Sequence, residues 1–276
     1  MPTPIGGSPL VLLKDGKGPA IVIAHGLAGT VQVARLAACF QTPHPIYGIQ
    51  AKGVDGAEEP LDRVEDMASY YVDAIDKHFP NGPYIVIGYS FGGLVALEMA
   101  QRLKDRGKEI LQLTLLDAYP HPQFLRFPTR TSLFVRRMIS HGQQMWHMPI
   151  RAGWSYFVKG VKRRLHLAPS HEPPPPRSSP RERILHLVSE KAYKAYTDYE
   201  PRFYAGKVSF VTTETKTFFP ADPATAWKHL VAELEVEVVP GDHLNIVTTK
   251  FESLAALLTR YIQQADLQMS ELSQSR

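Results

Sequence analysis

Short apolar runs alternate with helix-like stretches over the first 120 residues. The runs at residues 20–24, 84–87 and 110–116 are mostly apolar, which is typical of strands buried on both faces of a sheet. Residues 62–79 repeat apolar side chains at steps of three and four, and this pattern predicts an amphipathic helix. The order of strands and helices predicts a mostly parallel sheet with helices on both faces.

This pattern stops near residue 120 and returns near residue 201. Residues 121–200 show no buried-strand pattern, and their segment 169–180 is rich in proline, which predicts an extended or disordered loop. Two further strands and a closing amphipathic helix are expected after residue 206. We therefore expect one α/β core domain formed by residues 1–120 and 201–276, with residues 121–200 inserted as a helical lid.

The composition narrows the class of protein. Apolar residues make up 44% and charged residues 21% of the 276 positions, as in globular proteins rather than disordered chains. No run approaches the length of about 18 apolar residues that a transmembrane helix needs, and no secretory signal is expected at the N-terminus. Cys39 is the only cysteine, which excludes an internal disulfide and fits a cytoplasmic location.

A serine between two glycines follows the apolar run at residues 84–87. Gly88, Ser90 and Gly92 form the G-x-S-x-G pattern of a nucleophile elbow, and a helical pattern begins directly after it. Glycines are required in so sharp a turn because side chains there would collide with neighbouring backbone. We therefore expect Ser90 to be a catalytic nucleophile. The alternative is a glycine-rich turn with an incidental serine.

A serine hydroxyl needs a general base, and the base needs an acid to fix its tautomer. His243 follows the last expected strand, where a loop can bring its imidazole to the sheet edge. Asp117 ends the strand after the nucleophile helix and is the preferred acid, in the chain order Ser, Asp, His. Asp222 is the alternative acid, although its position also suits a helix N-cap. Asp242 adjoins His243 and is badly placed to turn back onto its Nδ1.

The oxyanion of an acyl-transfer intermediate needs two backbone N–H donors. The residue after the nucleophile, Phe91, is expected to supply one of them. The loop after the strand at residues 20–24 is expected to supply the other, from Leu27 or, as the near alternative, Ala28. No metal site is expected, because the histidines show no ligand spacing of the HExxH type.

Eight short motifs are spread over nearly the whole chain. They are HGLAG at 25–29, YGIQAKG at 47–53, VEDMAxxY at 64–71, GPY at 82–84, GYSFGG at 88–93, LDAYP at 116–120, AYxxYxP at 195–201 and GDH at 241–243. Together they resemble the thioesterase domains of nonribosomal peptide and polyketide synthases. That resemblance implies the α/β-hydrolase fold, with a mostly parallel central sheet, helices on both faces and a helical lid insertion.

The resemblance also implies a reaction. Such enzymes take an acyl, peptidyl or polyketide chain from the phosphopantetheine thiol of a carrier protein onto the serine, and release it by hydrolysis or macrocyclisation. It implies an acyl or peptidyl carrier protein as partner, and no cofactor beyond the phosphopantetheine that presents the substrate. The chain-terminating class keeps its acid where Asp117 stands, whereas the discrete editing class keeps it near Asp222.

Charge is unevenly distributed along the chain. The net charge is +4, but residues 121–183 carry +10, from twelve lysines and arginines against two glutamates. This segment is compatible with docking of an acidic carrier protein, or with a solvated face of the lid. Nucleic acid binding is not expected, because the arginines come without stacking aromatics or a known motif.

Two other functions are compatible with the same sequence features. One is a carboxylesterase or lipase-like serine hydrolase that acts on small oxoesters with the same residues. The other is a non-catalytic relative that binds a ligand or partner.

Overall fold

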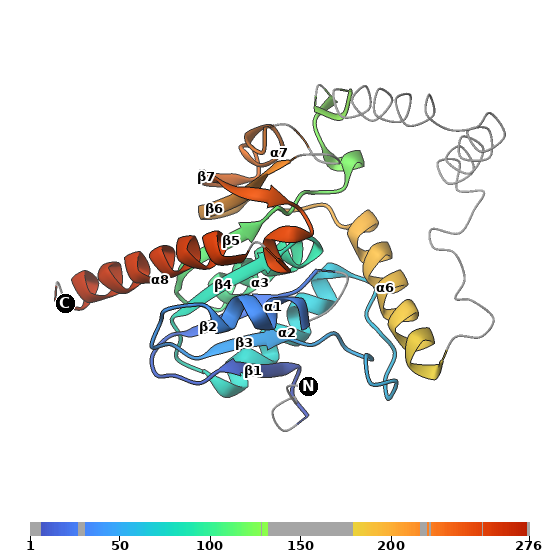
Figure 1. Cartoon of the computed structure of the whole chain (residues 1–276), viewed down its shortest axis with the longest axis horizontal. Helices are drawn as coiled ribbons and strands as arrows, with labels where there is room; N and C mark the ends of the chain where they lie inside the picture. The colour runs from blue at the N-terminus through green and yellow to red at the C-terminus, as the bar shows by residue number, and fades with distance from the viewer. Residues whose placement is uncertain are drawn as a thin grey trace.

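The computed structural model describes residues 7–26, 31–127, 129–131, 179–215, 220, 222–249 and 251–274. Its centre is a seven-stranded sheet of order β1-β3-β2-β4-β5-β6-β7 (Figure 1). The strands are β1 (Leu10–Lys14), β2 (Ala20–Ala24), β3 (Ile46–Ile49), β4 (Tyr84–Tyr89), β5 (Ile110–Leu116), β6 (Tyr204–Thr215) and β7 (Val231–Asp242). β1 pairs antiparallel with β3, and every other neighbouring pair in this sheet is parallel.

Helices cover both faces of the sheet, as the sequence predicts. α2 (Val64–His78) and α3 (Phe91–Asp105) pack on one face, and α1 (Val31–Ala38) and α8 (Phe251–Gln274) pack on the other. Successive residues of a strand point to opposite faces. Thus Val86 of β4 lies in the core with α2 and α3, whereas Ile85 and Ile87 lie in the core with α1 and α8.

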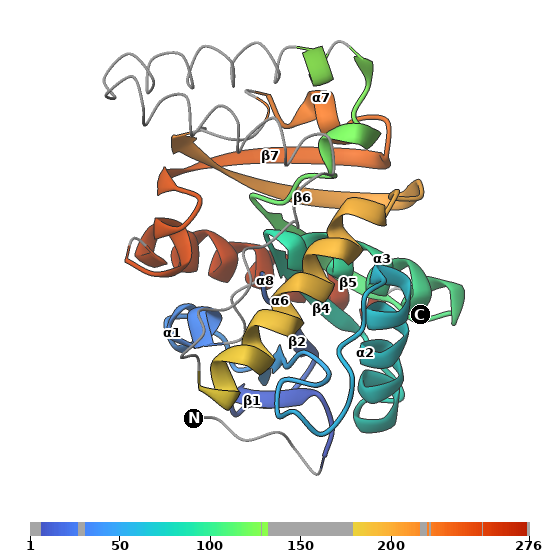
Figure 2. The same cartoon turned by 90° about the vertical axis from the view of Figure 1, so that its right-hand side faces the viewer.

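α6 (Pro180–Asp198) lies across one end of the sheet in both views (Figures 1 and 2). Its start is a capping box, in which Ser179 accepts a hydrogen bond from the Glu182 N–H and donates its own N–H to the Glu182 carboxylate. Pro180 suits the first helical position because that position needs no N–H donor. The proline-rich loop expected at 169–180 therefore ends at Ser179, and residues 169–178 lie outside the described residues.

Several short elements complete the described structure. α7 (Ala224–Trp227) connects β6 to β7, and the one-turn helices η1 (Pro122–Phe124) and η2 (Asn245–Val247) follow β5 and β7. The edge strand β1 and the helix α1 were not predicted from the sequence pattern. No helix within the described residues is long and apolar enough to span a bilayer.

Candidate active site

Ser90 stands on a sharp turn between β4 and α3. Its backbone has φ +55°, in the left-handed region that side chains rarely adopt. The turn is held because the Ser90 N–H donates to the Leu116 carbonyl at 2.9 Å. A Cβ atom at Gly88 would overlap the backbone of Gly92, and one at Gly92 would overlap the backbone of His25. Both glycines are therefore needed for steric reasons, as the motif predicts.

His243 lies between Ser90 and Asp117 and contacts both. Its Nε2 is 3.0 Å from the Ser90 Oγ, and its Nδ1 is 2.7 Å from the Asp117 Oδ2. With the proton on Nδ1, that N–H donates to Asp117 and leaves Nε2 free to accept from the Ser90 hydroxyl. The structure thus brings together the three residues that the sequence singled out, at the carboxyl ends of β4, β5 and β7.

Asp117 is buried and held on several sides. Its side chain is 1% exposed, and its backbone has φ +46°. Its N–H donates to the Val211 carbonyl at 2.7 Å, and the Thr212 hydroxyl donates to its second carboxylate oxygen at 3.3 Å. Tyr119 contacts the Thr212 hydroxyl in turn, at 3.3 Å. Thr212 was not predicted as a site residue, because β6 contains several other polar residues and its pattern does not distinguish this one.

The two other aspartates serve local turns instead. Asp222 accepts the Ala224 N–H at 2.9 Å at the start of α7, although Pro223 rather than Asp222 is the N-cap of that helix. Asp242 accepts the N–H groups of Leu244 and Asn245, each at 3.0 Å, and so shapes the loop after His243.

Phe91 opens α3, so its N–H is among those that have no acceptor within the helix. This is compatible with the oxyanion role expected for it. Leu27 and Ala28, the expected sources of the second donor, lie outside the described residues. The preceding Gly26 is described, and a Cβ atom there would lie 3.2 Å from the Ser90 Cβ. The end of β2 therefore does approach the nucleophile.

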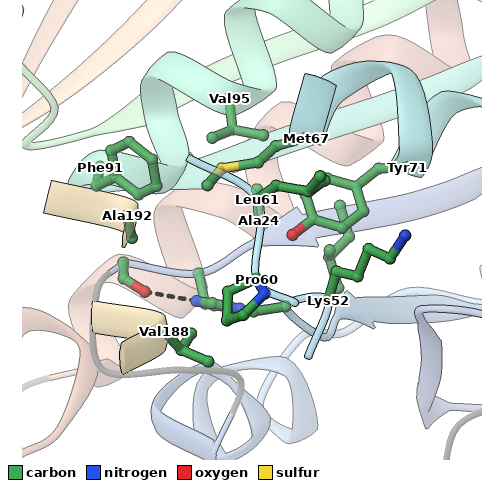
Figure 3. Close-up of a pocket in the computed structure, with 14 residues that line it drawn as sticks. Ala24, Lys52, Pro60, Leu61, Met67, Tyr71, Phe91, Val95, Val188 and Ala192 are labelled. Atoms are coloured by element: carbon green, nitrogen blue, oxygen red, sulfur yellow. Dashed lines mark hydrogen bonds between the residues drawn. The ribbon is translucent and has the colours of Figure 1, made fainter. Parts of the chain in front are cut away.

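A mostly apolar pocket of about 30 Å³ opens beside these residues (Figure 3). Met67 of α2 with Phe91 and Val95 of α3 form one side, and Val188 and Ala192 of α6 contribute another. A volume of this size exceeds the roughly 10–15 Å³ that a cavity needs to hold one water molecule. The pocket therefore has room for apolar atoms beside Phe91. Sequence periodicity could not identify it, because its wall comes from α6 packing on distant helices.

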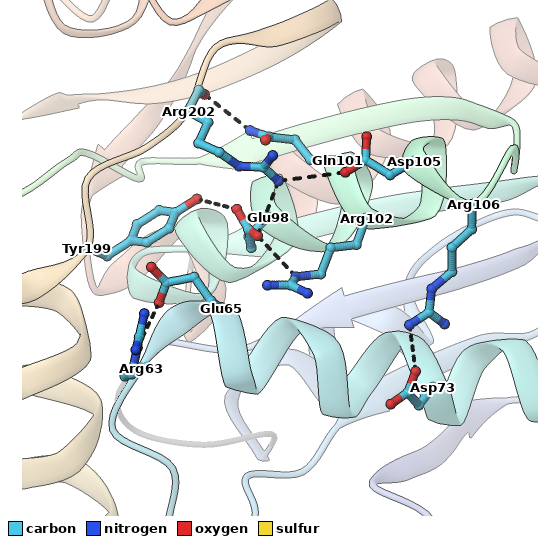
Figure 4. Close-up of polar contacts among 10 residues, drawn as sticks. All are labelled: Arg63, Glu65, Asp73, Glu98, Gln101, Arg102, Asp105, Arg106, Tyr199 and Arg202. Atoms are coloured by element: carbon cyan, nitrogen blue, oxygen red, sulfur yellow. Dashed lines mark hydrogen bonds and ion pairs between the residues drawn. The ribbon is translucent and has the colours of Figure 1, made fainter.

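A buried carboxylate fastens the end of α6 to α3 (Figure 4). Glu98 is 1% exposed and accepts hydrogen bonds from the Tyr199 hydroxyl at 3.0 Å, Arg102 at 3.0 Å and Arg202 at 3.4 Å. Burial and the nearby Glu98 charge raise the pKa of Tyr199, so its hydroxyl remains a donor at neutral pH. The chain after α6 is held again where Gln101 donates to the Arg202 carbonyl at 3.1 Å.

Within the described ranges, no group of three or more histidine, cysteine, aspartate or glutamate side chains could hold a metal ion.

The family model described as "Thioesterase domain" matches residues 19–262. Among curated proteins, the nonribosomal peptide synthetase pngA of Aspergillus terreus (strain NIH 2624 / FGSC A1156) is 37% identical over 111 residues, which cover 40% of this chain and 12% of that protein. The polyketide synthase PksR of Bacillus subtilis (strain 168) is 38% identical over 110 residues, covering 40% of this chain and 4% of that protein. These matches therefore span a small part of each synthase.

Solved structures with a similar fold include two thioesterase domains. The NocB thioesterase domain from the nocardicin cluster matches with a TM-score of 0.62 at 23% identity, covering 90% of this chain and 95% of that one. The wild-type Vlm2 thioesterase domain matches with a TM-score of 0.58 at 23% identity, covering 91% and 96%. At this level of identity the comparison shows the fold, which is the expected α/β-hydrolase fold.

Proposed function

The chain belongs to the thioesterase domain family of hydrolases, and we propose that it releases an acyl, peptidyl or polyketide chain from the phosphopantetheine thioester of a carrier protein. The observation that carries this proposal is the contact of His243 with both Ser90 and Asp117. That arrangement can turn a serine hydroxyl into a nucleophile for acyl transfer.

The first half of the reaction forms an acyl-enzyme. His243 Nε2 takes the Ser90 proton while Oγ attacks the thioester carbonyl carbon, and Asp117 stabilises the resulting imidazolium. The Phe91 N–H and a second donor, expected from Leu27 or Ala28, stabilise the oxyanion. The C–S bond then breaks, and the imidazolium proton passes to the departing phosphopantetheine thiolate, which leaves as the thiol. The product is an ester of Ser90 with the chain to be released.

The second half frees the chain. His243 removes a proton from water, or from a hydroxyl or amine of the chain itself, as that nucleophile attacks the ester carbonyl. The Ser90–acyl bond then breaks and Oγ regains its proton from His243. Hydrolysis and macrocyclisation share every step up to the acyl-enzyme, so the same residues serve both. The Asp117 contact favours the chain-terminating class over the editing class.

The surroundings of Ser90 also support an acyl substrate. The pocket beside Phe91 is mostly apolar, which suits the carbons next to the reacting carbonyl. The proposed partner is an acyl or peptidyl carrier protein. Its expected docking segment, residues 121–183, lies mostly outside the described residues. Cys39 is exposed and unpaired, which is compatible with the reducing cytoplasm that we propose as the location.

Intact-protein mass spectrometry tests this proposal. The purified chain is mixed with a panel of acyl-N-acetylcysteamine thioesters and with the matching oxoesters, and Ser90→Ala is treated in parallel. We expect the mass of the wild type to rise by one acyl group with thioesters, and the mass of Ser90→Ala to stay unchanged. Turnover of oxoesters without thioester acylation would favour the esterase alternative. Failure of a fluorophosphonate to label Ser90 would favour a non-catalytic relative.

A further inference from the structure

Tyr89, the residue before the nucleophile, contacts His243 in two ways. It is the last residue of β4 and is 3% exposed. Its hydroxyl donates to the His243 carbonyl at 2.6 Å. Its ring stacks on the imidazole, with 5.2 Å between the ring centroids and 26° between the planes. One side chain therefore holds both the backbone and the side chain of the same histidine.

These contacts matter because His243 lies on a loop. Asp242 shapes that loop beyond the histidine, since it accepts the N–H groups of Leu244 and Asn245. The His243 carbonyl is held from the other side, by β4 through Tyr89. The imidazole must reach the Asp117 Oδ2 and the Ser90 Oγ at the same time. A tilt of its plane would lengthen at least one of those hydrogen bonds.

We propose that Tyr89 is a positioning residue for His243, in which the hydroxyl fixes the loop backbone and the ring fixes the plane of the imidazole. This inference rests on the proposed function of Ser90 and His243. The ring also lies against the imidazolium that forms during the reaction, and an aromatic face attracts a cation. Tyr89 therefore acts on the reaction through His243.

The chemistry of Tyr89 suits this role. Burial, together with the charges of Asp117 and Asp242, raises the pKa of its hydroxyl. The hydroxyl therefore stays protonated and remains a donor throughout the neutral range. Because Ser90 follows Tyr89 directly, the same stretch of backbone carries both the nucleophile and the group that orients its base. This link ties the position of His243 to the strand that carries Ser90.

Two substitutions separate the two contacts, and a third is the control. Tyr89→Phe removes the hydroxyl and keeps the ring, whereas Tyr89→Leu removes both. The control is Tyr84→Phe, at the start of the same strand, where a fully buried tyrosine donates its hydroxyl to the Phe79 carbonyl. It loses a tyrosine hydroxyl from β4 at the end away from Ser90.

The readouts are kcat and KM for a thioester, the rate of Ser90 labelling by a fluorophosphonate, and thermal unfolding. We expect kcat and the labelling rate to fall about tenfold in Tyr89→Phe, from the loss of one hydrogen bond. In Tyr89→Leu we expect a fall of about 100-fold, as for a misplaced catalytic group. KM should stay unchanged in both variants, and Tyr84→Phe should keep the wild-type kcat.

Three outcomes would overturn the proposal. They are equal losses of kcat in Tyr89→Phe and Tyr84→Phe, a rise in KM without a fall in kcat, and a wild-type labelling rate in Tyr89→Phe. If Tyr89→Leu does not fold, Tyr89→Phe still decides. The labelling rate also separates this inference from the proposed function, because it needs an activated Ser90 but no thioester. A wild type that labels but does not cleave thioesters contradicts the proposed function alone.

Discussion

The reacting groups at the sheet edge and the pocket wall formed by α6 are held in place differently. Ser90 and Asp117 adopt left-handed backbone conformations, and each donates its N–H to a carbonyl of a neighbouring strand. α6 is fastened by side chains instead. The buried Glu98 binds Tyr199 just beyond its C-terminal end, and the half-exposed Asp62 binds Lys191 at 3.2 Å near its middle.

Because the two regions are held differently, the rate of the chemical step and the selection of the substrate should depend on different residues. Moving Ser90 or Asp117 requires breaking the sheet, so the positions of the nucleophile and of the acid are tied to global folding. Moving α6 requires breaking a few side-chain contacts, and some of these are exposed and weakened by salt. The rate of the chemical step should therefore depend on a few buried atoms. The choice of acyl group should respond to changes along α6, and substitutions in the two regions should have separable effects.

The largest effect is expected at the acid. Asp117→Asn keeps the shape of the side chain but favours the wrong imidazole tautomer, so we expect kcat for thioester hydrolysis to fall about 10⁴-fold. Asp222→Asn is the matched control, because Asp222 accepts the Ala224 N–H, and it should keep nearly full activity. Steady-state kinetics with one thioester substrate measures both. A larger loss in Asp222→Asn would reassign the acid and favour the editing class.

The next largest effect is expected at Glu98, the buried carboxylate that holds Tyr199 at the end of α6. Glu98→Ala removes the acceptor of the Tyr199 hydroxyl and of Arg102, and leaves Arg202 with its longer ion pair to Asp105 at 3.8 Å. We expect the free energy of unfolding, measured in urea, to fall by about 3 kcal/mol, because one partner of a buried polar cluster is removed. Fluorophosphonate labelling of the remaining folded protein should keep its rate.

The control for this change is Glu65→Ala, since Glu65 forms an exposed pair with Arg63 at 3.6 Å. That pair should contribute less than about 1 kcal/mol. A fall in the labelling rate of folded Glu98→Ala would show that the reacting groups and α6 are coupled, and would contradict the separation of the two regions.

The contrast between the two regions also explains what the sequence could predict. Ser90, Asp117 and His243 were identifiable because parallel strands end at one sheet edge, so chain order alone brings their side chains near each other. The contact of Glu98 with Tyr199 joins residues 101 positions apart. It depends on how α6 packs across α3, which no local pattern encodes. The pocket wall was missed for the same reason.

Two elements of the core were also missed, for local reasons. β1 is a short edge strand with a half-exposed end, so neither a buried run nor a full alternation marks it. α1 has only eight residues. A helical periodicity is recognised over windows of about 11–18 residues, so this helix is too short to be detected by its pattern. The strands β6 and β7 were predicted over residues 207–212 and 234–239, but each extends three residues further at both ends. At the start of the two strands the buried Tyr204 and Val231 still pair with each other.

A smaller effect tests α6 as a determinant of substrate size. Ala192 is 7% exposed and lines the pocket that also contains Phe91. Ala192→Leu adds three carbons to a space of about 30 Å³. We expect kcat/KM for a butanoyl thioester to fall about tenfold relative to an acetyl thioester, as one or two displaced methylenes in a pocket would cause.

Glu190→Leu is the control for this substitution, because it adds the same side chain at an exposed position of α6. It should leave the ratio between the two substrates unchanged. An unchanged ratio in Ala192→Leu would mean that the acyl chain follows another path from Ser90.

The smallest effect is expected at Asp62, the half-exposed carboxylate that binds Lys191 near the middle of α6. A hydrogen bond from Lys191, helped by the charges of Lys191 and Lys194, lowers the pKa of Asp62 below its usual 3.8. A lowered folded-state pKa stabilises the protein above the unfolded value, and this contribution is lost as the pH falls through the folded value. At pH 7, Asp62→Asn should therefore lower the free energy of unfolding by about 0.5 kcal/mol, as for a surface pair.

That difference between wild type and Asp62→Asn should shrink in 1 M salt and below about pH 3.8, while fluorophosphonate labelling of Ser90 stays at the wild-type rate. Chemical denaturation of wild type and Asp62→Asn across a pH and salt series measures this difference in the free energy of unfolding. A difference that persisted in acid would have to arise from packing, because protonated aspartate and asparagine are both uncharged. The middle of α6 would then be held as rigidly as the sheet edge, and selectivity would be as hard to change as the chemistry.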